Sequence, residues 1–271
     1  MPLVLRYQAT TSVPVEVEGL VPAAVRGKPL AEIERIHLFH GNRQLPLAEF
    51  FQVSGDPSDS CIEFEGDLAG VHWIGAKMAE GSIRVAGNAG RHVGSEMTGG
   101  EIHVDGNAGD WVGGEMHGGF IHVRGSAGHL VGAAYRGSAR GMTKGTILIG
   151  GDVGNEVGHT MRRGLIVVGG SAGDFACLNM IAGSMFVLGA CGIRPAAGMR
   201  RGTLALLGDN PPPLLPTFRL AGRARPQFLR LYLLALRKHG YPVPDSILSA
   251  EYLLYSGDFV ALGRGEILIR A

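Results

Sequence analysis

Apolar residues alternate with other residues between glycines through the middle of the chain, and this alternation recurs at a fixed interval. In one clear case Ile83 and Val85 are separated by one residue, Gly81 precedes them and Gly87 follows them. A Met lies five positions before the first apolar residue of each pair, at Met78, Met97, Met116, Met142, Met161, Met180 and Met199. Successive units are nineteen residues long, except the unit that ends at Met142. So regular a period indicates a repeat architecture.

The length of the unit limits which repeat fold it can form. The apolar-x-apolar signal predicts a short strand, and the flanking glycines supply the positive φ of tight corners. Three short strands and three corners fit in nineteen residues, whereas a helical unit does not. A left-handed helix of hexapeptides needs a unit divisible into hexapeptides, which nineteen is not. We therefore predict a right-handed parallel β-helix of about eight coils.

Stacked coils would bring equivalent positions into columns, and the columns can be interpreted chemically. We expect the Met and Ile/Val columns to point inward, together with a column of small residues that includes Ala89, Ala108 and Cys191. A polar column lies beside the small one, at Asn88, Asn107, Ser126, Asp152 and Ser171. Stacked polar side chains of this kind predict a ladder of hydrogen bonds at a corner.

One column changes character along the chain. The residue between the two strand apolar residues is polar at first, at Arg84, His103 and His122. It then becomes apolar, at Leu148, Val167, Phe186 and Ala205. An exposed apolar face of this size requires a cover. We expect either the C-terminal tail of the chain or another subunit to lie on it.

The two ends of the chain do not repeat. Open strand edges at the first coil require a cap, and residues 1–60 are predicted to provide it, with the repeat at 61–208. After Gly208 a run of three prolines ends the ladder, and residues 226–239 predict an amphipathic helix that covers the sheet face or the last coil. The C-terminal helix and tail would then span residues 209–271.

Composition excludes several classes of function. A net charge of +1 argues against nucleic acid as a main partner. Three cysteines without a C-x-x-C pair are typical of a reduced, cytoplasmic protein, and we expect neither a leader nor a membrane span. The histidines lack carboxylates or thiols at ligand spacing, so no metal, cofactor or catalytic site is expected in this chain. Asp105 and Asp110 beside Arg124 come nearest to an acid cluster for a free-standing, carbohydrate-active β-helix protein.

The repeat is interrupted once, and a basic corner follows the interruption. The unit that ends at Met142 is seven residues longer than the others, so we expect Tyr135, Arg136 and Arg140 to project from the stack. Basic residues then recur just after the Met of later units, at Lys144, Arg162, Arg163, Arg200 and Arg201. Loops that project from a regular solenoid commonly bind partners. The alternatives are a tolerated bulge and a solvated basic face.

These motifs carry a family resemblance. The nineteen-residue M-x-x-G-x-I-x-V-x-G-x-A-G unit resembles the Gly-rich β-helix of the glutamate synthase C-terminal domain and of the formylmethanofuran dehydrogenase C subunit. The Y-R-G-x-x-R-G-M insertion and the S-G-D…G-x-G-E-I ending, Tyr135–Met142 and Ser256–Ile267, are similar to the latter specifically. The bacterial counterpart is the equivalent subunit in the formyltransferase/hydrolase complex of methylotrophs.

The resemblance implies a role in one-carbon metabolism. In such complexes formyl groups pass between tetrahydromethanopterin and a methanofuran-type carrier with a polyglutamyl tail, and formate is released. Zinc, and in archaeal relatives tungsto- or molybdopterin, belongs to partner subunits, and the C subunit has no known catalytic residue. The resemblance thus implies a non-catalytic structural subunit whose basic residues meet other subunits or, ranked lower, the polyglutamyl tail. An archaeal formylmethanofuran dehydrogenase is the alternative assembly.

Overall fold

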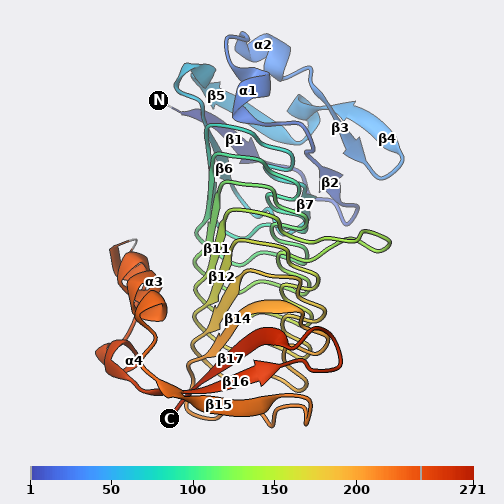
Figure 1. Ribbon diagram of the computed structural model, residues 1–271. Coiled ribbons are helices and arrows are strands. Elements are labelled where there is room, and N and C mark those ends of the chain that lie inside the picture. The colour runs from blue at the N-terminus through green and yellow to red at the C-terminus, as the bar shows by residue number, and fades with distance from the viewer. Residues whose placement is uncertain (1, 239) are drawn as a thin grey trace.

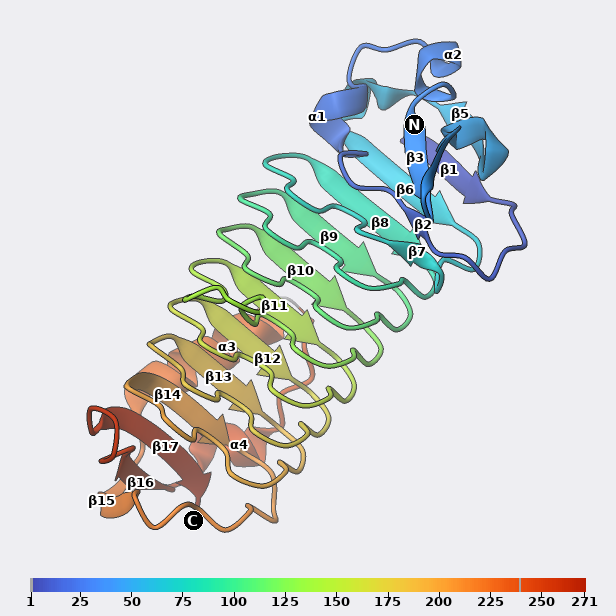
Figure 2. The same ribbon diagram turned by 90° about the vertical axis from the view of Figure 1, so that its right-hand side faces the viewer.

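The computed structural model describes residues 2–238 and 240–271, and it shows a mostly β protein with few helices. Its thirteen-stranded mixed sheet runs along the whole molecule, and a four-stranded sheet lies at the N-terminal end (Figure 1). The mostly β prediction is confirmed. The nineteen-residue units appear as stacked turns of chain, each contributing one strand to the long sheet (Figure 2).

The repeat strands lie parallel and in register. They are β6 (Cys61–Glu65), β8 (Ser82–Ala86), β9 (Glu101–Val104), β10 (Phe120–Val123), β11 (Thr146–Ile149), β12 (Leu165–Val168), β13 (Ser184–Val187) and β14 (Arg201–Leu206). Equivalent residues face each other, as Ile83 and Ile102 do. A second parallel column of single bridges joins Ala89 to Ala108 and continues to Cys191. Each unit therefore pairs with the next on more than one side.

The inward columns are those that the sequence predicted. All seven repeat Met residues and the paired strand residues, such as Ile83 and Val85, are buried. Met, being flexible, fills the irregular space between corner and strand. The small residues of the bridge column are also buried from Ala89 to Ala172, whereas Cys191, predicted to point inward with them, is only half-buried.

The predicted polar ladder is present, but its bonds run from backbone to side chain. Asn88 Oδ1 accepts the N–H of Asn107 at 2.9 Å, and Asn107 Oδ1 accepts the N–H of Ser126 at 2.8 Å. The series continues through Asp152 and Ser171. Each side chain thereby satisfies a corner N–H of the following coil that has no strand partner.

A second ladder was not predicted. It begins where His72 Nδ1 accepts the N–H of Arg91 at 3.0 Å, and it resumes where Asp110 accepts the N–H of His129 at 2.8 Å. His129, Asn155 and Asp174 carry it onward. The mixture of His, Asp and Asn hid the column in the sequence, although all three side chains offer the acceptor that the position needs.

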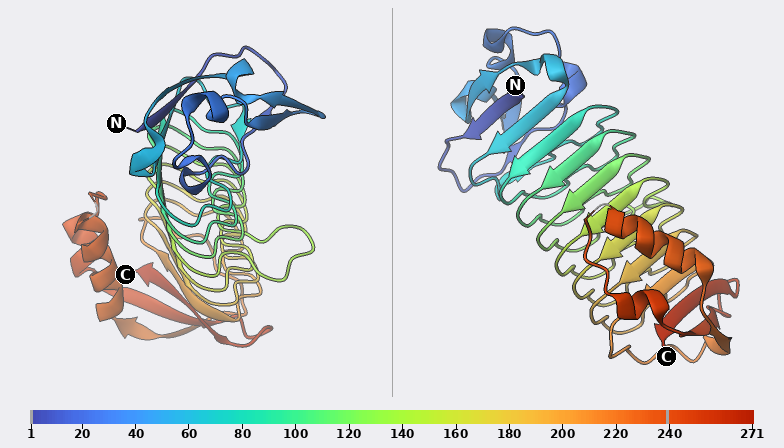
Figure 3. Two further views of the ribbon diagram at one scale, coloured as in Figure 1. Left: turned by 90° about the horizontal axis from the view of Figure 1, so that it is seen from above. Right: turned by 90° about the vertical axis from the view of Figure 1, so that its left-hand side faces the viewer.

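Helix α3 (Gln227–Lys238) covers the apolar half of the sheet face (Figure 3). Leu229, Leu233 and Leu236 pack with α4 (Asp245–Ser249) over the outward column, in which Phe186 and Val167 are fully buried. The Tyr241 hydroxyl donates a hydrogen bond to the Ile149 carbonyl at 2.5 Å. The predicted cover is therefore the chain's own tail. Where α3 is absent, the same column is polar.

The N-terminal residues extend the long sheet and build the small one. Strands β1 (Leu3–Tyr7) and β5 (Phe51–Gly55) continue the long sheet beyond β6. The small sheet contains β2 (Val15–Glu16), β3 (His37–His40), β4 (Arg43–Pro46) and β7 (Val71–His72). Short helices connect these strands, namely α1 (Pro22–Val25), α2 (Leu30–Ile33), η1 (Leu47–Glu49) and η2 (Pro57–Asp59).

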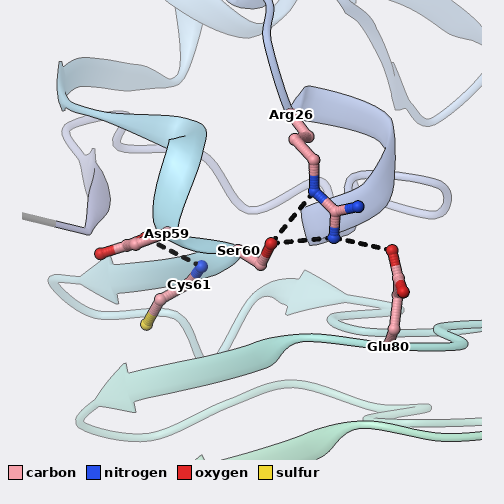
Figure 4. A network of polar contacts seen from close by, with 5 residues as sticks. All are labelled: Arg26, Asp59, Ser60, Cys61 and Glu80. Carbon is pink, nitrogen blue, oxygen red and sulfur yellow. Dashed lines mark hydrogen bonds and ion pairs between the residues drawn. The ribbon is translucent and has the colours of Figure 1, made fainter.

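Polar contacts fasten α1 to the first coils (Figure 4). Arg26, which caps α1, donates to Ser60 Oγ and pairs with Glu80 at 2.7 Å. Asp59 Oδ1 accepts the N–H of Cys61 at 3.0 Å where β6 begins. The N-terminal elements are thus seated on the repeat.

The C-terminal strands close the other end. Strand β17 (Arg264–Arg270) pairs parallel with β14, and β16 (Tyr252–Gly257) and β15 (Arg219–Ala224) follow antiparallel. Because the sheet passes through both predicted boundaries, at 60 and at 208, the three-part division remains a prediction.

The close contact between the backbones of neighbouring repeat units leads to a prediction about the stability of two glycine variants. Gly119 and Gly137 both have positive φ, +90° and +87°. A Cβ on Gly119 would lie 2.8 Å from the Gly100 carbonyl oxygen of the neighbouring coil, while a Cβ on Gly137 would meet nothing within 4 Å. Gly137→Ala should lower the free energy of unfolding by about 1–2 kcal/mol through its φ alone. Gly119→Ala should cost about 1–3 kcal/mol more, because the coils must separate.

Urea denaturation of the two variants and the wild-type chain measures this difference. Equal losses would contradict the prediction and would mean that the coils can move apart without cost.

Candidate functional site

The insertion leaves the stack as a loop at residues 133–141, on the side away from α3 (Figure 1). Arg136 and Arg140 are exposed there, and neither forms an ion pair with another described residue. Tyr135 behaves differently from the prediction. It is half-buried and lies against the stack, so two of the three predicted residues project and the third does not.

Tyr135 is held by a column of aromatic rings that the sequence interpretation missed. Trp73 and His92 stack with ring centroids 3.9 Å apart, and Trp111 follows at 6.0 Å from His92. The Tyr135 ring lies 4.9 Å from that of Trp111, and its hydroxyl is 3.3 Å from His92 Nδ1. The Tyr135 N–H also donates to Glu115 at 2.9 Å. The base of the insertion is therefore anchored.

A signal for this column exists in the sequence. The only two tryptophans of the chain, Trp73 and Trp111, are separated by two repeat lengths with His92 midway between them. All three residues have positive φ, between 64° and 66°. That conformation is rare for bulky residues, so the column combines packing with a strained corner.

The column is uncharged at neutral pH. Burial, followed by the nearby His72 and Arg91, lowers the pKa of His92 to about 4. Burial raises the pKa of Tyr135 to about 12. At pH 7 the His92 imidazole is therefore neutral and the Tyr135 phenol is protonated, so ring packing and a hydrogen bond, rather than an ion pair, hold the base of the insertion.

The basic corner is divided between two surfaces. Arg162, Arg200 and Arg201 line a groove of about 240 Å³ together with Ile181 and Leu262. Arg163 instead lines a hollow with Tyr232, on the side of α3. Lys144 is exposed at the position equivalent to Arg163. The intervening unit has Ile181 and Ala182 at these positions, so the basic residues do not form a continuous column.

The remaining candidate groups do not converge on a reactive site. Arg124 pairs with Asp105 at 3.1 Å, whereas Asp110 pairs with Arg91. Burial raises the pKa of the Cys191 thiol to about 12. Within residues 2–238 and 240–271, no group of three or more His, Cys, Asp or Glu side chains could hold a metal ion. No helix in these same ranges is long and apolar enough to cross a membrane.

Comparison with known proteins first defines the class, a glycine-rich repeat protein. The GXGXG motif model matches residues 71–211, which is more than half of the chain. The chain therefore belongs to the GXGXG family. It is also similar, from end to end, to a chain in the X-ray crystal structure of the formyltransferase/hydrolase complex (FhcABCD) from Methylorubrum extorquens in complex with methylofuran. Identity is 35%, coverage is 99% of each chain, and the TM-score is 0.90.

Two curated relatives point in the same direction. The C subunit of the tungsten-containing formylmethanofuran dehydrogenase 2 of Methanothermobacter thermautotrophicus is 36% identical over 95 residues, 34% of this chain and 35% of that protein. The C subunit of the molybdenum-containing formylmethanofuran dehydrogenase 1 of Methanosarcina barkeri is also 36% identical over 95 residues, 34% of this chain and 32% of that protein. The matched stretch thus spans about a third of these relatives. The family resemblance expected from the sequence is confirmed.

The burial of the His92 imidazole leads to a prediction about how the free energy of unfolding depends on pH. The folded pKa of His92 lies below its ordinary value of 6.5, so between pH 6.5 and about 4 the unfolded chain binds a proton that the folded chain does not. The free energy of unfolding should therefore fall as pH falls through this window. His92→Phe keeps a ring in the stack and removes the titration, so its stability should fall less than that of the wild type.

Denaturant titrations at several pH values test this, with His103→Phe, at a half-exposed position of the outward column, as the matched control. If His92→Phe retains the wild-type pH dependence, the burial of His92 does not control acid stability.

Proposed function

We propose that this chain is the non-catalytic structural subunit of a hetero-oligomeric complex of one-carbon metabolism. The complex would transfer formyl groups between tetrahydromethanopterin and a methanofuran-type carrier and release formate. The observation that carries the proposal is the end-to-end likeness to a chain of the formyltransferase/hydrolase complex, which includes the terminal elements as well as the repeat. The partners are then the other subunits of the complex.

The fold fits this role as a right-handed parallel β-helix between two caps. Strands β6 and β8–β14 supply eight coils. Parallel strands joined by a crossover are right-handed in nearly all proteins, which supports this hand. Residues 1–60 form the N-terminal cap, and residues 209–271 form the C-terminal helix and tail. A solenoid of this kind offers long, rigid faces to partners.

An archaeal tungsten- or molybdenum-containing formylmethanofuran dehydrogenase is the second candidate. The names of the curated relatives favour it. It ranks second because those likenesses cover only about a third of the chain, whereas the bacterial likeness covers 99%. In either complex, metals and pterins would belong to partner subunits.

This assignment makes a prediction about metal content. The chain purified alone should contain no stoichiometric zinc, iron, molybdenum or tungsten, because its described side chains do not gather a ligand set. Elemental analysis by mass spectrometry measures this, with the co-purified complex as the positive control. A stoichiometric metal in the isolated chain would contradict the proposed role.

The insertion and the basic corner are proposed to dock acidic surface of a partner subunit. Tyr135 anchors the loop, so Arg136 and Arg140 are presented from a fixed base. Guanidinium groups suit bidentate pairing with carboxylates. Lys144, Arg162, Arg163, Arg200 and Arg201 extend the basic surface along later coils. The polyglutamyl tail of a furan carrier is the lower-ranked target.

Removing the two loop arginines tests the docking. Arg136→Ala with Arg140→Ala should weaken assembly by about 2–5 kcal/mol, because partner carboxylates are left unpaired. The melting temperature of the isolated chain should remain nearly unchanged, because both side chains are exposed. Sedimentation or native mass spectrometry of the co-expressed subunits measures assembly.

Arg35→Ala with Arg43→Ala, two exposed arginines of the N-terminal region, is the matched control. Normal assembly with full activity would make the insertion a tolerated bulge. Normal assembly with turnover lost only on the polyglutamylated carrier would identify the tail as the target.

A further inference from the structure

A short turn between β16 and β17 exposes three apolar side chains. Phe259, Val260 and Leu262 are 55%, 80% and 49% exposed. The turn, residues 258–263, lies at the end of the stack opposite the N-terminal elements (Figure 1). Exposed apolar side chains grouped in this way mark an interaction surface more often than isolated ones do.

The turn is rigidly held although its side chains are exposed. The buried Asp258 carboxylate accepts the N–H groups of Gly198 and Val260, each at 3.0 Å. The Asp258 N–H donates a hydrogen bond to the Met199 carbonyl at 3.2 Å, and the Gly263 N–H donates one to the Asp258 carbonyl at 2.9 Å. These bonds tie the turn to the last Met corner. Val260 is therefore presented in a fixed position, and binding through it would cost little ordering entropy.

Grooves flank the turn on the side of the basic corner. A hollow of about 550 Å³ runs between Asn179, Arg200 and the turn residues Val260 and Leu262. The smaller groove lined by Arg162, Arg200 and Arg201 adjoins it at Leu262. The apolar side chains thus stand beside concave, basic surface.

The surrounding charge is strongly positive. Arg264 lies directly opposite Arg201 in the parallel pairing of β17 with β14, and Arg219 lies 5.8 Å from the centre of the Phe259 ring. None of these arginines, nor Arg162 or Arg200, forms an ion pair within the described ranges of the chain. The arginines outnumber the two acidic residues of this region, Asp258, which accepts backbone N–H groups, and Glu266, which accepts the Thr203 hydroxyl. Adjacent like charges repel, so an external anionic surface would relieve them.

We propose that the 258–263 turn inserts into an apolar pocket of another subunit, and that carboxylates around this pocket pair with Arg162, Arg200, Arg201 and Arg264. An apolar centre enclosed by a charged rim is the usual arrangement of a protein interface. The inference deepens the proposed function, on which it rests for the identity of the partner. It adds an apolar anchor at the end of the stack to the docking surface proposed for the insertion and the basic corner.

Two glutamate substitutions test the proposal in the co-expressed complex. Val260→Glu removes the apolar anchor and sets a carboxylate against carboxylates, so incorporation should fall at least about tenfold. Leu231→Glu is the matched control, because Leu231 is 68% exposed but lies on α3. Incorporation is the fraction of tagged chain that carries the other subunits in native mass spectrometry. The melting temperature of each isolated variant should match that of the wild type.

Charge reversal gives an independent readout. Arg200→Glu with Arg264→Glu should also lower incorporation at least about tenfold, while Arg35→Glu with Arg43→Glu should not. Loss with Val260→Glu and with the Arg200/Arg264 pair, but not with the controls, supports the proposal. Unchanged incorporation of Val260→Glu, or equal loss with Leu231→Glu, overturns it.

Two further outcomes overturn the proposal in distinguishable ways. If the wild-type chain itself does not assemble with the other subunits, the proposed function fails together with this inference. If wild-type chain floats with phosphatidylserine vesicles, Val260→Glu does not, and assembly is unaffected in both, the turn binds lipid and only this inference fails.

Discussion

Each repeat unit of this protein rests on the backbone of the unit before it, and that contact constrains nearly everything else. The Phe120 N–H reaches the Gly100 carbonyl at 3.0 Å, and the same bond recurs between later coils. A glycine is required at the corner because the carbonyl of the neighbouring coil occupies the place of a side chain. Hydrogen bonds that always join equivalent positions require units of equal length. A unit with extra residues must expel them, and the insertion at 133–141 is the result.

The same constraint explains the distribution of polar and apolar residues on the outer sheet face. The outward column runs without a break from Glu63 in β6 to Leu268 in β17. The geometry of the sheet therefore does not explain why its residues change from polar to apolar. The change coincides with α3. Polar His103 and His122 stand where the helix is absent, and buried Phe186 stands beneath it. One continuous sheet can thus carry two different surfaces, because each repeat unit contributes a single residue to the column.

How much of this could be predicted from the sequence depends on whether a column keeps its residue type. The Met and Ile/Val columns keep theirs, so their burial followed directly from the period. The outward column becomes apolar at Leu148, which correctly predicted that something covers this part of the sheet. The amphipathic pattern at residues 226–239 then indicated a helix of the chain itself as the covering element. The second ladder was missed because His72, Asp110 and Asn155 share an acceptor but not a residue type.

The candidate site shows the same limit at a larger scale. An insertion was predictable from length alone, and so was the exposure of Arg136 and Arg140. The inward return of Tyr135 was not, because it depends on Trp111 and His92, which lie 24 and 43 residues earlier in the chain. The division of the basic corner also escaped prediction, since Arg162 and Arg163 are neighbours in sequence but face different hollows.

The aromatic column has a consequence for how the unfolding of this protein can be observed. Both tryptophans belong to that column, so intrinsic indole fluorescence senses the N-terminal half of the stack and the base of the insertion. The half beneath α3 contains no tryptophan and is optically silent by this probe. Solenoids can lose their coils in stages. Fluorescence and far-ultraviolet circular dichroism would then report different midpoints on one sample, and the separation between them would measure how independently the two halves come apart.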